Sequence, residues 1–597
     1  MLVDVTRSGY GNPYYAAGAL AASHSWSALF NNAADLSGYV SLDKGPLPDW
    51  IMGLSGRLLG FGSLSVMLPN ALCGTATVLV LHDAVRRALG HQIAIVAALL
   101  MAITPVAVLV GRYNTPDGLL LLLLVCAARS LTRAVQGGRT RDLLLCGVFV
   151  GLAFNTKMLE AYVVLPALAL PLLVARREPM LRRLRELAVA AAAALLVSVA
   201  WFGTMMLLPA SDRPYVSDTP GNSWFQLIFE GNGFRRIAGQ GGAFGQHLES
   251  QAGWLFTQHI AGQISWLLPL ALVGLLFGLV ASWSSRGSAP AFNAYLLWGT
   301  WALVGCGVLS FSAGIRHAYY TSILAPAVAT LAAAALVAPW RAVRESPVVA
   351  LATAFVVGVS AIVSYVLLAH SGVPWLRWVV LAFTGLAFLA LVAPHLLTAL
   401  RGTASMTIAI GATSIALLAG PAAYSLATVG RAQTGYDPVA GPAPPEGKRV
   451  PAKARRRALS AADSLALLIP YLVSHRAGAR YLVAATDART AAPIALATTT
   501  AVITVGGFLG ADPTPTAPQI VELISSGQLR YVLLDSTREF PASRAHRFTT
   551  APEWVIAHCS RVPYASLIGP GSTERLPPGV TSTLTLFACG ATASTRP

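Results

Sequence analysis

The chain has 597 residues, of which 55% are hydrophobic and only 11% are charged. A soluble protein of this size carries roughly a quarter charged residues, so the composition excludes an ordinary soluble protein. Apolar runs of about 20 residues, the length that crosses a bilayer, recur through the first 430 positions. The net charge of +17 is explained by basic cytoplasmic loops. The sequence therefore predicts a polytopic α-helical membrane protein and not a nucleic-acid-binding protein.

The first 61 residues precede the apolar runs and are polar or weakly amphipathic. No basic stretch followed by an apolar core occurs there, so they do not read as a signal peptide. Within them, the segment Asp35–Trp50 concentrates three acids, one lysine and two prolines in a chain with few charges. Residues 49–59 predict a short amphipathic helix that lies in the membrane interface.

A membrane domain of about twelve helices is predicted over residues 62–429. The approximate limits of the spans are 62–83, 92–111, 117–135, 142–156, 158–175, 186–208, 260–282, 292–311, 318–339, 346–369, 375–397 and 404–428. Arginines are concentrated in alternate loops, and the positive-inside rule places those loops in the cytoplasm. Segment 1–61, the long loop 209–259 and the C-terminal region then face outward. An outward N-terminal segment needs either an unusual mode of insertion or a span before it, and we expect a first transmembrane helix upstream of Met1.

The chain changes character after the last span. Residues 430–458 are rich in proline and basic residues and predict a linker. From 459 to 597, helix and strand patterns predict a soluble α/β domain with a small parallel sheet. Cys559 and Cys589 lie in this domain, and a disulfide between them is expected if the domain is extracytoplasmic. The other four cysteines are interpreted as packing residues, and no spacing predicts a metal site.

Asp43 and Lys44 are the first candidates for chemistry, because charges near a membrane are expensive and often functional. A lysine at headgroup level can bind a lipid phosphate as a point charge. A neighbouring carboxylate can take a proton from an attacking hydroxyl. The alternative is that the two residues only anchor the segment in the interface.

A second set of candidates lies at the ends of predicted spans. Arg112, Asn114 and Asp117 belong to one outward loop, where rigid helices could present them to sugar hydroxyls or a phosphate. A capping role at a helix start explains Asp117 equally well. Lys157 is a candidate phosphate ligand, and snorkelling towards the interface is its alternative explanation.

Further candidates lie in other predicted outward segments. His317 and Tyr320 stand at a helix start, where an interfacial aromatic belt is the alternative explanation. Asn222 belongs to the long loop 209–259, which could close over a substrate, since uncommonly long loops are often functional.

At these motifs the chain resembles the GT-C glycosyltransferases of the protein-mannosyltransferase and aminoarabinose-transferase superfamily, glycosyltransferase family 39-like. The matching segments are Asp43-Lys44-Gly45-Pro46 after Tyr15-Ala16-Ala17, Asn114-Thr115-Pro116-Asp117, Asn155-Thr156-Lys157-Met158 and His317-Ala318-Tyr319-Tyr320. A closer resemblance is to the YkcA/YkcB-type mannosyltransferases. The segments that carry it are Gly11–Ala17, Arg213–Tyr215, Gly506–Phe508 and Asp512–Thr516. Each motif is weak alone, but their order over nearly the whole chain makes the set specific.

The resemblance implies a GT-C fold and inverting transfer of a sugar from a polyprenyl phosphate to an acceptor at the outer membrane face. Many members carry an Asp-Glu pair in the first outer loop, where this chain has Gly11-Asn12. The expected general base is therefore Asp43, with Asp35 or Asp117 as the alternatives. Asn12 and Tyr15 are expected to contact substrate in that loop.

In the expected mechanism, Lys44 binds the donor phosphate together with Lys157 and Arg112, and these cations stabilise the leaving phosphate. Asp43 deprotonates the acceptor hydroxyl, and Asp117 orients the acceptor or the base. Gly45 replaces the first proline of the family's Lys-Pro-Pro motif, which loosens that turn.

The expected partners are a polyprenyl-phosphate sugar, mannose-like or other, an envelope protein, lipid or glycan acceptor, and membrane lipid. No nucleic acid, obligatory cofactor or metal is expected. The expected location is the bacterial cytoplasmic membrane, with multiple passes and an extracytoplasmic C-terminal domain. Two other functions stay open, a catalytically inactive membrane scaffold and a lipid-linked-sugar transporter. A transporter would show inverted repeats and helices broken at the bilayer midplane.

Overall fold

The computed structural model describes residues 1–174, 178–234, 253–283, 290–314, 316–397, 402–442, 461–535, 550–567 and 583–590. The chain divides into two compact units, each built from segments far apart in the sequence. The first unit is Met1–Gly11, Met67–Gly203 and Asn232–Pro445, and the second is Asn12–Val66, Thr204–Gly231 and Glu446–Pro597. Residues 235–252 of the predicted loop 209–259 and residues 443–458 of the predicted linker lie outside the described residues.

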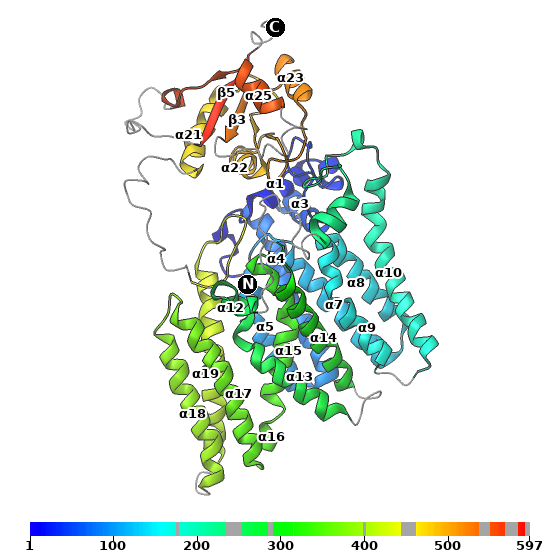
Figure 1. Ribbon diagram of the computed structural model, residues 1–597, viewed down its shortest axis with the longest axis vertical. Helices are drawn as coiled ribbons and strands as arrows, with labels where there is room; N and C mark the ends of the chain where they lie inside the picture. The colour runs from blue at the N-terminus through cyan, green and yellow to red at the C-terminus, as the bar shows by residue number, and fades with distance from the viewer. Residues whose placement is uncertain are drawn as a thin grey trace. The chain divides into compact units, whose positions relative to one another are not determined.

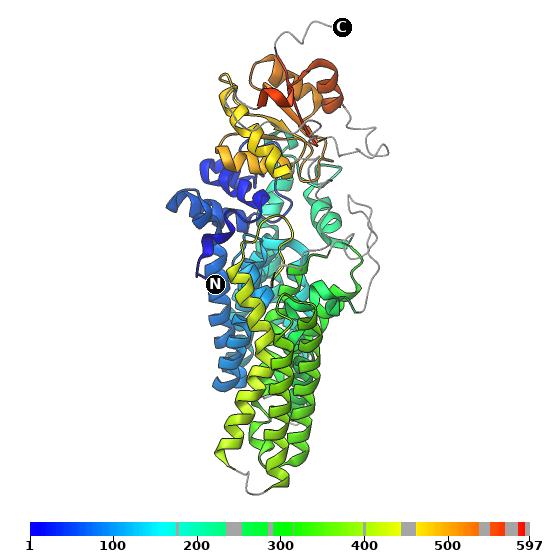
Figure 2. The ribbon, with the colours of Figure 1, turned by 90° about the vertical axis from the view of Figure 1, so that its left-hand side faces the viewer.

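The first unit is helical and contains most of the apolar helices. Its longer helices are α4 (Ser63–Leu89), which begins in the second unit, α7 (Asp117–Gly137), α8 (Thr140–Lys157), α9 (Leu165–Val174), α10 (Met180–Leu207), which ends in the second unit, α13 (Leu268–Ser282), α14 (Pro290–Phe311), α15 (Ala325–Val337), α17 (Pro347–Ala369), α18 (Leu376–Leu396) and α19 (Thr403–Gly430). Helix α7 packs against α8, α13 against α15, and α18 against both α17 and α19 (Figures 1 and 2). Large apolar side chains on α10 and α18, such as Leu196 and Leu389, are exposed, as lipid-facing residues would be.

The remaining helices before the C-terminal sheet, apart from α1 to α3, have at most twelve residues. They are η1 (Val5–Ser8), α5 (His91–Ala102), α6 (Pro105–Val110), η2 (Met158–Val164), η3 (Ala210–Asp212, in the second unit), η4 (Gln226–Phe234, which crosses from the second unit into the first), η5 (Trp254–Phe256), α12 (Gln258–Ile264), η6 (Ser265–Leu267), η8 (Ala318–Leu324) and α16 (Trp340–Val343).

Ten stretches of the described chain are long and apolar enough to cross a membrane, whereas the sequence predicts about twelve spans. Two differences account for the count. The predicted spans 142–156 and 158–175 fall within one run, Thr140–Val174, although Met158 at φ 51° interrupts the helical backbone between them. The predicted span 92–111 is divided into α5 and α6, because proline at position 105 cannot continue the preceding helix.

The second unit contains a five-stranded sheet from the C-terminal part of the chain. Its strands are β1 (Ala484–Ala485), β2 (Ile503–Thr504), β3 (Tyr531–Asp535), β4 (Ser560–Arg561) and β5 (Leu584–Ala588), in the order β2-β1-β3-β5-β4. Strand β1 pairs in parallel with β2 and β3, with Ala484 opposite Ile503 and Val532. Strand β5 runs antiparallel to β3 and β4. The α/β prediction is confirmed, but the sheet is mixed and not purely parallel.

Helices cover this sheet and complete its core. They are α21 (Ala461–Ser474), α22 (Ala488–Thr498), α23 (Ala517–Ser525), α25 (Thr550–His558) and the short η10 (Tyr564–Leu567). Leu472, Ile494 and Leu533 belong to one buried cluster between helices and strands. A disulfide joins Cys559, just after α25, to Cys589, just after β5, which is the pairing that the sequence predicts for an extracytoplasmic domain.

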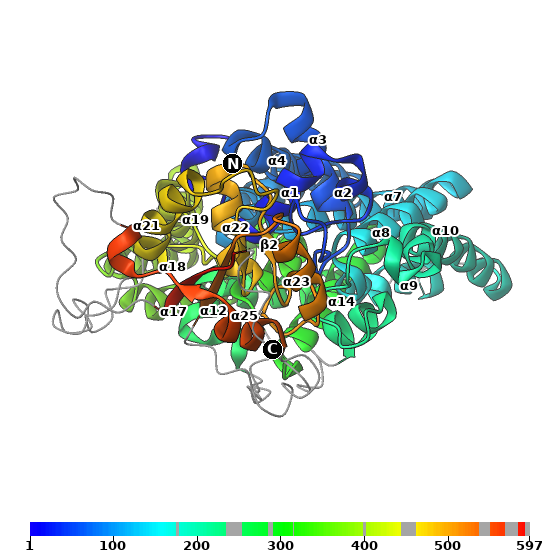
Figure 3. The same ribbon diagram turned by 90° about the horizontal axis from the view of Figure 1, so that it is seen from above.

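Three N-terminal helices belong to the same unit as the sheet. They are α1 (Pro13–His24), α2 (Trp26–Phe30) and α3 (Leu47–Leu59). Helix α3 is the predicted amphipathic helix 49–59, and it begins two residues earlier because proline is tolerated in a first helical turn. Helix α1 packs against α3 and α22 (Figure 3). The buried helix α1 was not predicted, since segment 1–61 reads as polar or weakly amphipathic.

Candidate active site

Asp43 and Lys44 form an ion pair in the second unit. Lys44 Nζ lies 2.5 Å from Asp43 Oδ2, and the side chains of Lys44 and Asp43 are only 9% and 13% exposed. The same ammonium donates to the main-chain carbonyl of Asp43 at 3.3 Å. Adjacent residues of opposite charge are thus held together at low exposure, where a Coulomb interaction is stronger than in open water.

Neighbouring segments fix the backbone around this pair. Ser41 donates its N–H to the carbonyl of Tyr215 at 2.9 Å, and Tyr215 donates to the carbonyl of Tyr39 at 2.9 Å. The side chain of Asn32 donates to the carbonyl of Lys44, also at 2.9 Å. Hydrogen bonds on both sides therefore hold residues 39–44, which is the rigidity that a reacting group needs.

Tyr14 contacts the pair directly and was not predicted as a site residue. Its hydroxyl accepts the N–H of Asp43 at 3.1 Å, and its side chain is buried. Burial raises the pKa of Tyr14 well above its ordinary value, and the negative charge of Asp43 adds to the effect. The predicted residue Tyr15 packs its ring 5.4 Å from that of Tyr14. The tyrosine doublet ahead of an alanine-rich stretch was the available signal.

Asp35 and Asn12 have structural partners. One oxygen of Asp35 accepts the N–H of Ser37 at 2.7 Å and that of Gly38 at 3.3 Å, and the other accepts the hydroxyl of Thr504. Burial raises the pKa of Asp35, and these hydrogen bonds oppose the shift. Asn12 caps α1 by accepting the N–H of Tyr14 at 3.0 Å. The role of Asp35 as an alternative base and that of Asn12 in binding substrate stay predictions.

Asn222 organises the loop that braces residues 39–44. Its side-chain oxygen accepts from Arg213 at 2.7 Å and from the N–H of Val216 at 2.9 Å. Its carbonyl accepts a second guanidinium hydrogen bond at 2.9 Å. The Arg213–Tyr215 motif therefore closes a compact turn against Asn222, and Tyr215 extends from this turn to residues 39–41.

A second charged cluster lies in the first unit. Asp117 is in the first turn of α7 and Lys157 is in the last turn of α8, the helix ends at which the dipole favours those charges. Lys157 Nζ lies 2.7 Å from Asp117 and 2.9 Å from Glu160. It also lies 4.0 Å from the centre of the Tyr320 ring. Glu160 was not among the predicted site residues, although it stands three positions after Lys157.

The remaining candidates of the first unit have defined contacts. The ring of His317 stacks on Tyr319 at 5.1 Å and meets Tyr320 edge-on at 5.1 Å. Its Nδ1 lies 3.1 Å from a carboxylate oxygen of Asp437. The structure thus brings Asp117, Lys157, Tyr320 and His317 into one connected group.

Arg112 and Asn114 lie in the loop that leads into α7. The guanidinium of Arg112 donates to the main-chain carbonyl of Met1 at 2.7 Å, to that of Asp4 at 2.9 Å and also to that of Val3. The side chain of Asn70 donates to the carbonyls of Tyr113 and Thr115 on either side of the fully buried Asn114. Arg112 therefore fastens the N-terminal segment, and its proposed contact with phosphate stays a prediction.

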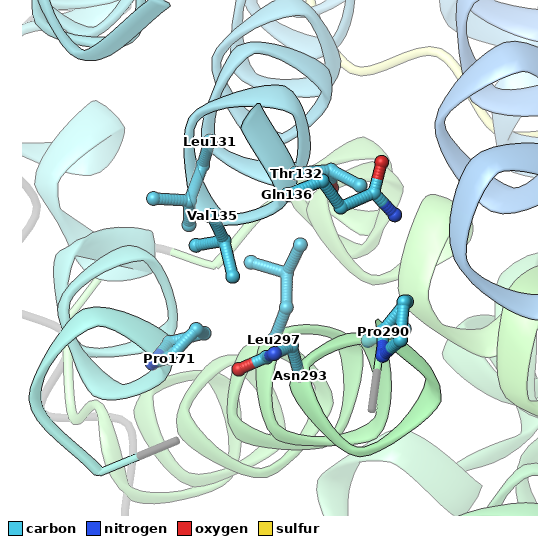
Figure 4. Close-up of a pocket in the computed structure, with 9 residues that line it drawn as sticks. Leu131, Thr132, Val135, Gln136, Pro171, Pro290, Asn293 and Leu297 are labelled. Carbon is cyan, nitrogen blue, oxygen red and sulfur yellow. The ribbon is translucent and has the colours of Figure 1, made fainter. Parts of the chain in front are cut away.

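The described part of the chain contains no group of three or more His, Cys, Asp or Glu side chains placed to hold a metal ion. A mostly apolar pocket lies between α7, α9 and α14 (Figure 4). It is lined by residues such as Leu131, Pro171 and Leu297, and none of its lining residues is a candidate site residue.

Two family models match the chain in succession. The model described as "Dolichyl-phosphate-mannose-protein mannosyltransferase" matches residues 43–202. The model described as "Putative mannosyltransferase YkcB-like, C-terminal" matches residues 468–558. The first match begins at Asp43 and includes Asp117 and Lys157.

Two curated relatives come from Bacillus subtilis (strain 168). "Putative mannosyltransferase YycA" is 28% identical over 88% of this chain and 87% of its own length. "Putative mannosyltransferase YkcB" is 27% identical over 87% of this chain and 85% of its own length.

A solved structure with a similar fold is ArnT from Cupriavidus metallidurans bound to undecaprenyl phosphate. The TM-score is 0.53 at 17% identity, with 99% of this chain and 97% of that chain covered. The apo form of the same protein also has a TM-score of 0.53. This similarity shows the fold. The family models and the curated relatives, together with this GT-C fold and the ten apolar helices, support a multi-pass membrane glycosyltransferase that is similar to the YkcB-type mannosyltransferases.

Proposed function

We propose that the chain transfers a sugar from a polyprenyl-phosphate donor to an acceptor hydroxyl of the cell envelope, at the outer face of the cytoplasmic membrane. The observation that carries this proposal is the Asp43–Lys44 ion pair, held at low exposure in a braced segment. The undecaprenyl phosphate bound to ArnT supports the class of donor. The Cys559–Cys589 disulfide supports an extracytoplasmic C-terminal part, since such bonds persist in oxidising compartments.

In the proposed reaction, the acceptor oxygen attacks the anomeric carbon from the face opposite the phosphate. The bond from the anomeric carbon to the phosphate oxygen breaks, and polyprenyl phosphate leaves with the electron pair. Asp43 takes the acceptor proton, and Lys44 stabilises the charge on the departing phosphate. Donor binding would move Lys44 from the Asp43 carboxylate to the phosphate, which leaves that carboxylate to act as the base.

The proposed roles of the other candidates follow from their surroundings. Tyr14 holds the main chain of Asp43. Asp117 and Lys157 form a second charged group that belongs to the same family match, and we assign them to orienting substrate. Asp43 is preferred to Asp35 as the base, because the carboxylate of Asp35 already accepts hydrogen bonds from Ser37, Gly38 and Thr504.

The test is sugar transfer by the purified full chain in lipid nanodiscs. Radiolabelled polyprenyl-phosphate mannose or arabinose is the donor, and envelope extract supplies the acceptor. Asp43→Asn is expected to lower kcat by about 10²- to 10⁴-fold, the usual contribution of a general base. Lys44→Ala is expected to lower kcat and to raise the KM for the donor.

The matched control is the exposed ion pair Glu178–Arg182, whose charged atoms lie 2.8 Å apart on and just before α10. Glu178→Gln and Arg182→Ala should transfer sugar as the wild type does. Unchanged transfer in both Asp43→Asn and Lys44→Ala would overturn the site assignment. No transfer by the wild type with either donor would favour an inactive scaffold.

A further inference from the structure

The loop after strand β2 of the C-terminal sheet, residues 506–514, is compact and held by its own backbone hydrogen bonds. Asp512 donates its N–H to the carbonyl of Gly506 at 2.9 Å, and Gly506 donates to the carbonyl of Thr514 at 2.8 Å. Gly507 has φ +69°, and a Cβ at this position would overlap the carboxylate of Asp512. The glycines are therefore needed to let the backbone approach that carboxylate. The family resemblance singles out these residues, but the proposed reaction does not use them.

The Asp512 carboxylate holds the loop that braces Asp43. Its two oxygens accept the N–H of Asp218 at 3.1 and 3.0 Å. One of them also accepts the hydroxyl of Ser217 at 3.1 Å. Ser217 in turn donates its N–H to the hydroxyl of Ser41 at 3.4 Å. Residues 217–218 follow Tyr215 in the same loop, so Asp512 holds the part of this loop that comes after Tyr215.

A second contact leads from the same loop to Asp43. The ring of Phe508 lies 4.7 Å from the ring of Tyr14, within the range of a favourable aromatic pair. The Tyr14 hydroxyl accepts the N–H of Asp43. Two independent routes, one polar and one aromatic, therefore connect the loop 506–514 with the backbone of the expected base.

We propose that the C-terminal domain is part of the catalytic apparatus, with Asp512 and Phe508 as positioning residues that hold Asp43 and Tyr14 in their working geometry. This inference rests on the proposed function. Neither residue needs to contact substrate. Asp512 acts through the loop 213–219, and Phe508 acts through Tyr14. The C-terminal part of the chain is thus assigned a role in the transfer step itself.

The groups that face Asp512 are consistent with this role. The charges or hydroxyls of Asp43, Asp218, Tyr14 and Tyr215 interact with its carboxyl group electrostatically. Burial raises the pKa of Asp512 to about 8, and the neighbouring acids contribute to the increase. An acid that is protonated near neutral pH adds no negative charge beside Asp43.

The experiment compares Asp512→Ala with the conservative Asp512→Asn in the full chain. Asp512→Ala removes the hydrogen bonds to Ser217 and Asp218. It should lower kcat by about 10- to 100-fold, since a small displacement of a catalytic group lowers the rate strongly. The KM for the donor should stay the same, because Asp512 does not touch it. Asp512→Asn should recover most of the activity, because its amide oxygen can still accept the N–H of Asp218. Glu553, an exposed acid in the first turn of α25, supplies the matched control, and Glu553→Gln should match the wild type.

A second measurement does not depend on transfer. In Asp512→Ala and Phe508→Ala, hydrogen–deuterium exchange of the amides of residues 39–44 should be faster, whereas Glu553→Gln should leave it unchanged. Wild-type kcat in Asp512→Ala, or unchanged exchange of these amides, would overturn the inference. A raised donor KM in both Asp512 variants would also overturn it, since it would indicate direct contact with substrate. If the wild type transfers no sugar, the proposed function fails, and the exchange result alone decides whether the loop positions Asp43.

Discussion

Removing the carboxylate of Asp117 is expected to destabilise the membrane-spanning unit by about 3 kcal/mol or more. Asp117 is fully buried, and it lies 2.7 Å from Lys157, which is 3% exposed. Breaking a buried ion pair leaves one charge uncompensated, which costs about 3–5 kcal/mol. In Asp117→Ala, Lys157 keeps Glu160 at 2.9 Å, so the loss should fall at the lower end of this range. In Lys157→Ala, the carboxylate of Asp117 stays buried without its cation, so the loss should be larger.

The assay is denaturant unfolding of the purified chain in detergent, monitored by tryptophan fluorescence. The free energies of unfolding of the variants are compared with the m-value held constant. The double variant Asp117→Leu/Lys157→Met should recover much of the stability lost in either single variant, because it leaves no charge at the two buried positions, and the side chain of Glu160, which loses Lys157, is 23% exposed to water. Glu178→Gln breaks an exposed pair and should cost about 0–1 kcal/mol. A loss in Asp117→Ala no larger than that in Glu178→Gln would refute the reasoning, as would a double variant less stable than both single variants.

Three further predictions concern the C-terminal domain. Gly507→Ala should accelerate exchange of residues 39–44 and lower kcat, because its Cβ would displace the Asp512 carboxylate; wild-type exchange would contradict this. Because the pKa of Asp512 is raised to about 8, the folded chain keeps a proton that the unfolded chain releases, so the contribution of this group to stability falls as pH rises from about 4 to about 8. Between pH 5 and pH 8.5, the Tm of Asp512→Asn should depend less on pH than the Tm of the wild type. Parallel curves of Tm against pH for the two proteins would contradict this contribution of Asp512. Cys559→Ser should lower the stability of this domain by about 2–4 kcal/mol, measured as earlier proteolysis of the domain with and without reductant. Equal resistance to proteolysis in the variant and the wild type would contradict that expectation.

The helical part of the fold was predictable, because its signal is local. Runs of about 20 apolar residues identify spans such as α17 and α19 within a few residues of their observed limits. Helix α1 was missed for a physical reason. Its alanines and glycine give no apolar face by periodicity, and their burial results from close packing against α3 and α22. Such burial depends on segments far apart in the sequence, which a local pattern does not record.

The candidate site was predictable as a set of residues, but its connections were not. Adjacent charges identified Asp43 and Lys44, and the structure pairs them. The sequence did not indicate that Thr504, 469 residues later, donates a hydrogen bond to Asp35. The sequence also did not show that Arg112 donates its hydrogen bonds to main-chain carbonyls, whereas Lys44 and Lys157 are paired with carboxylates. These distinctions depend on tertiary contacts.

The contacts of Lys44 and Lys157 also distinguish their chemistry. Lys157 is paired with two carboxylates, Asp117 and Glu160, and lies over the ring of Tyr320. A phosphate that reached this ammonium would have to displace two anions, both of which would then need new partners at low exposure. Lys44 is paired with the carboxylate of Asp43. Exchange of this carboxylate for a donor phosphate keeps the lysine neutralised and leaves Asp43 available as a base. On these electrostatic grounds, we propose Lys44 as the ligand for the lipid phosphate, whereas Lys157, as part of a fixed and paired group at the ends of α7 and α8, keeps its proposed role in orienting substrate.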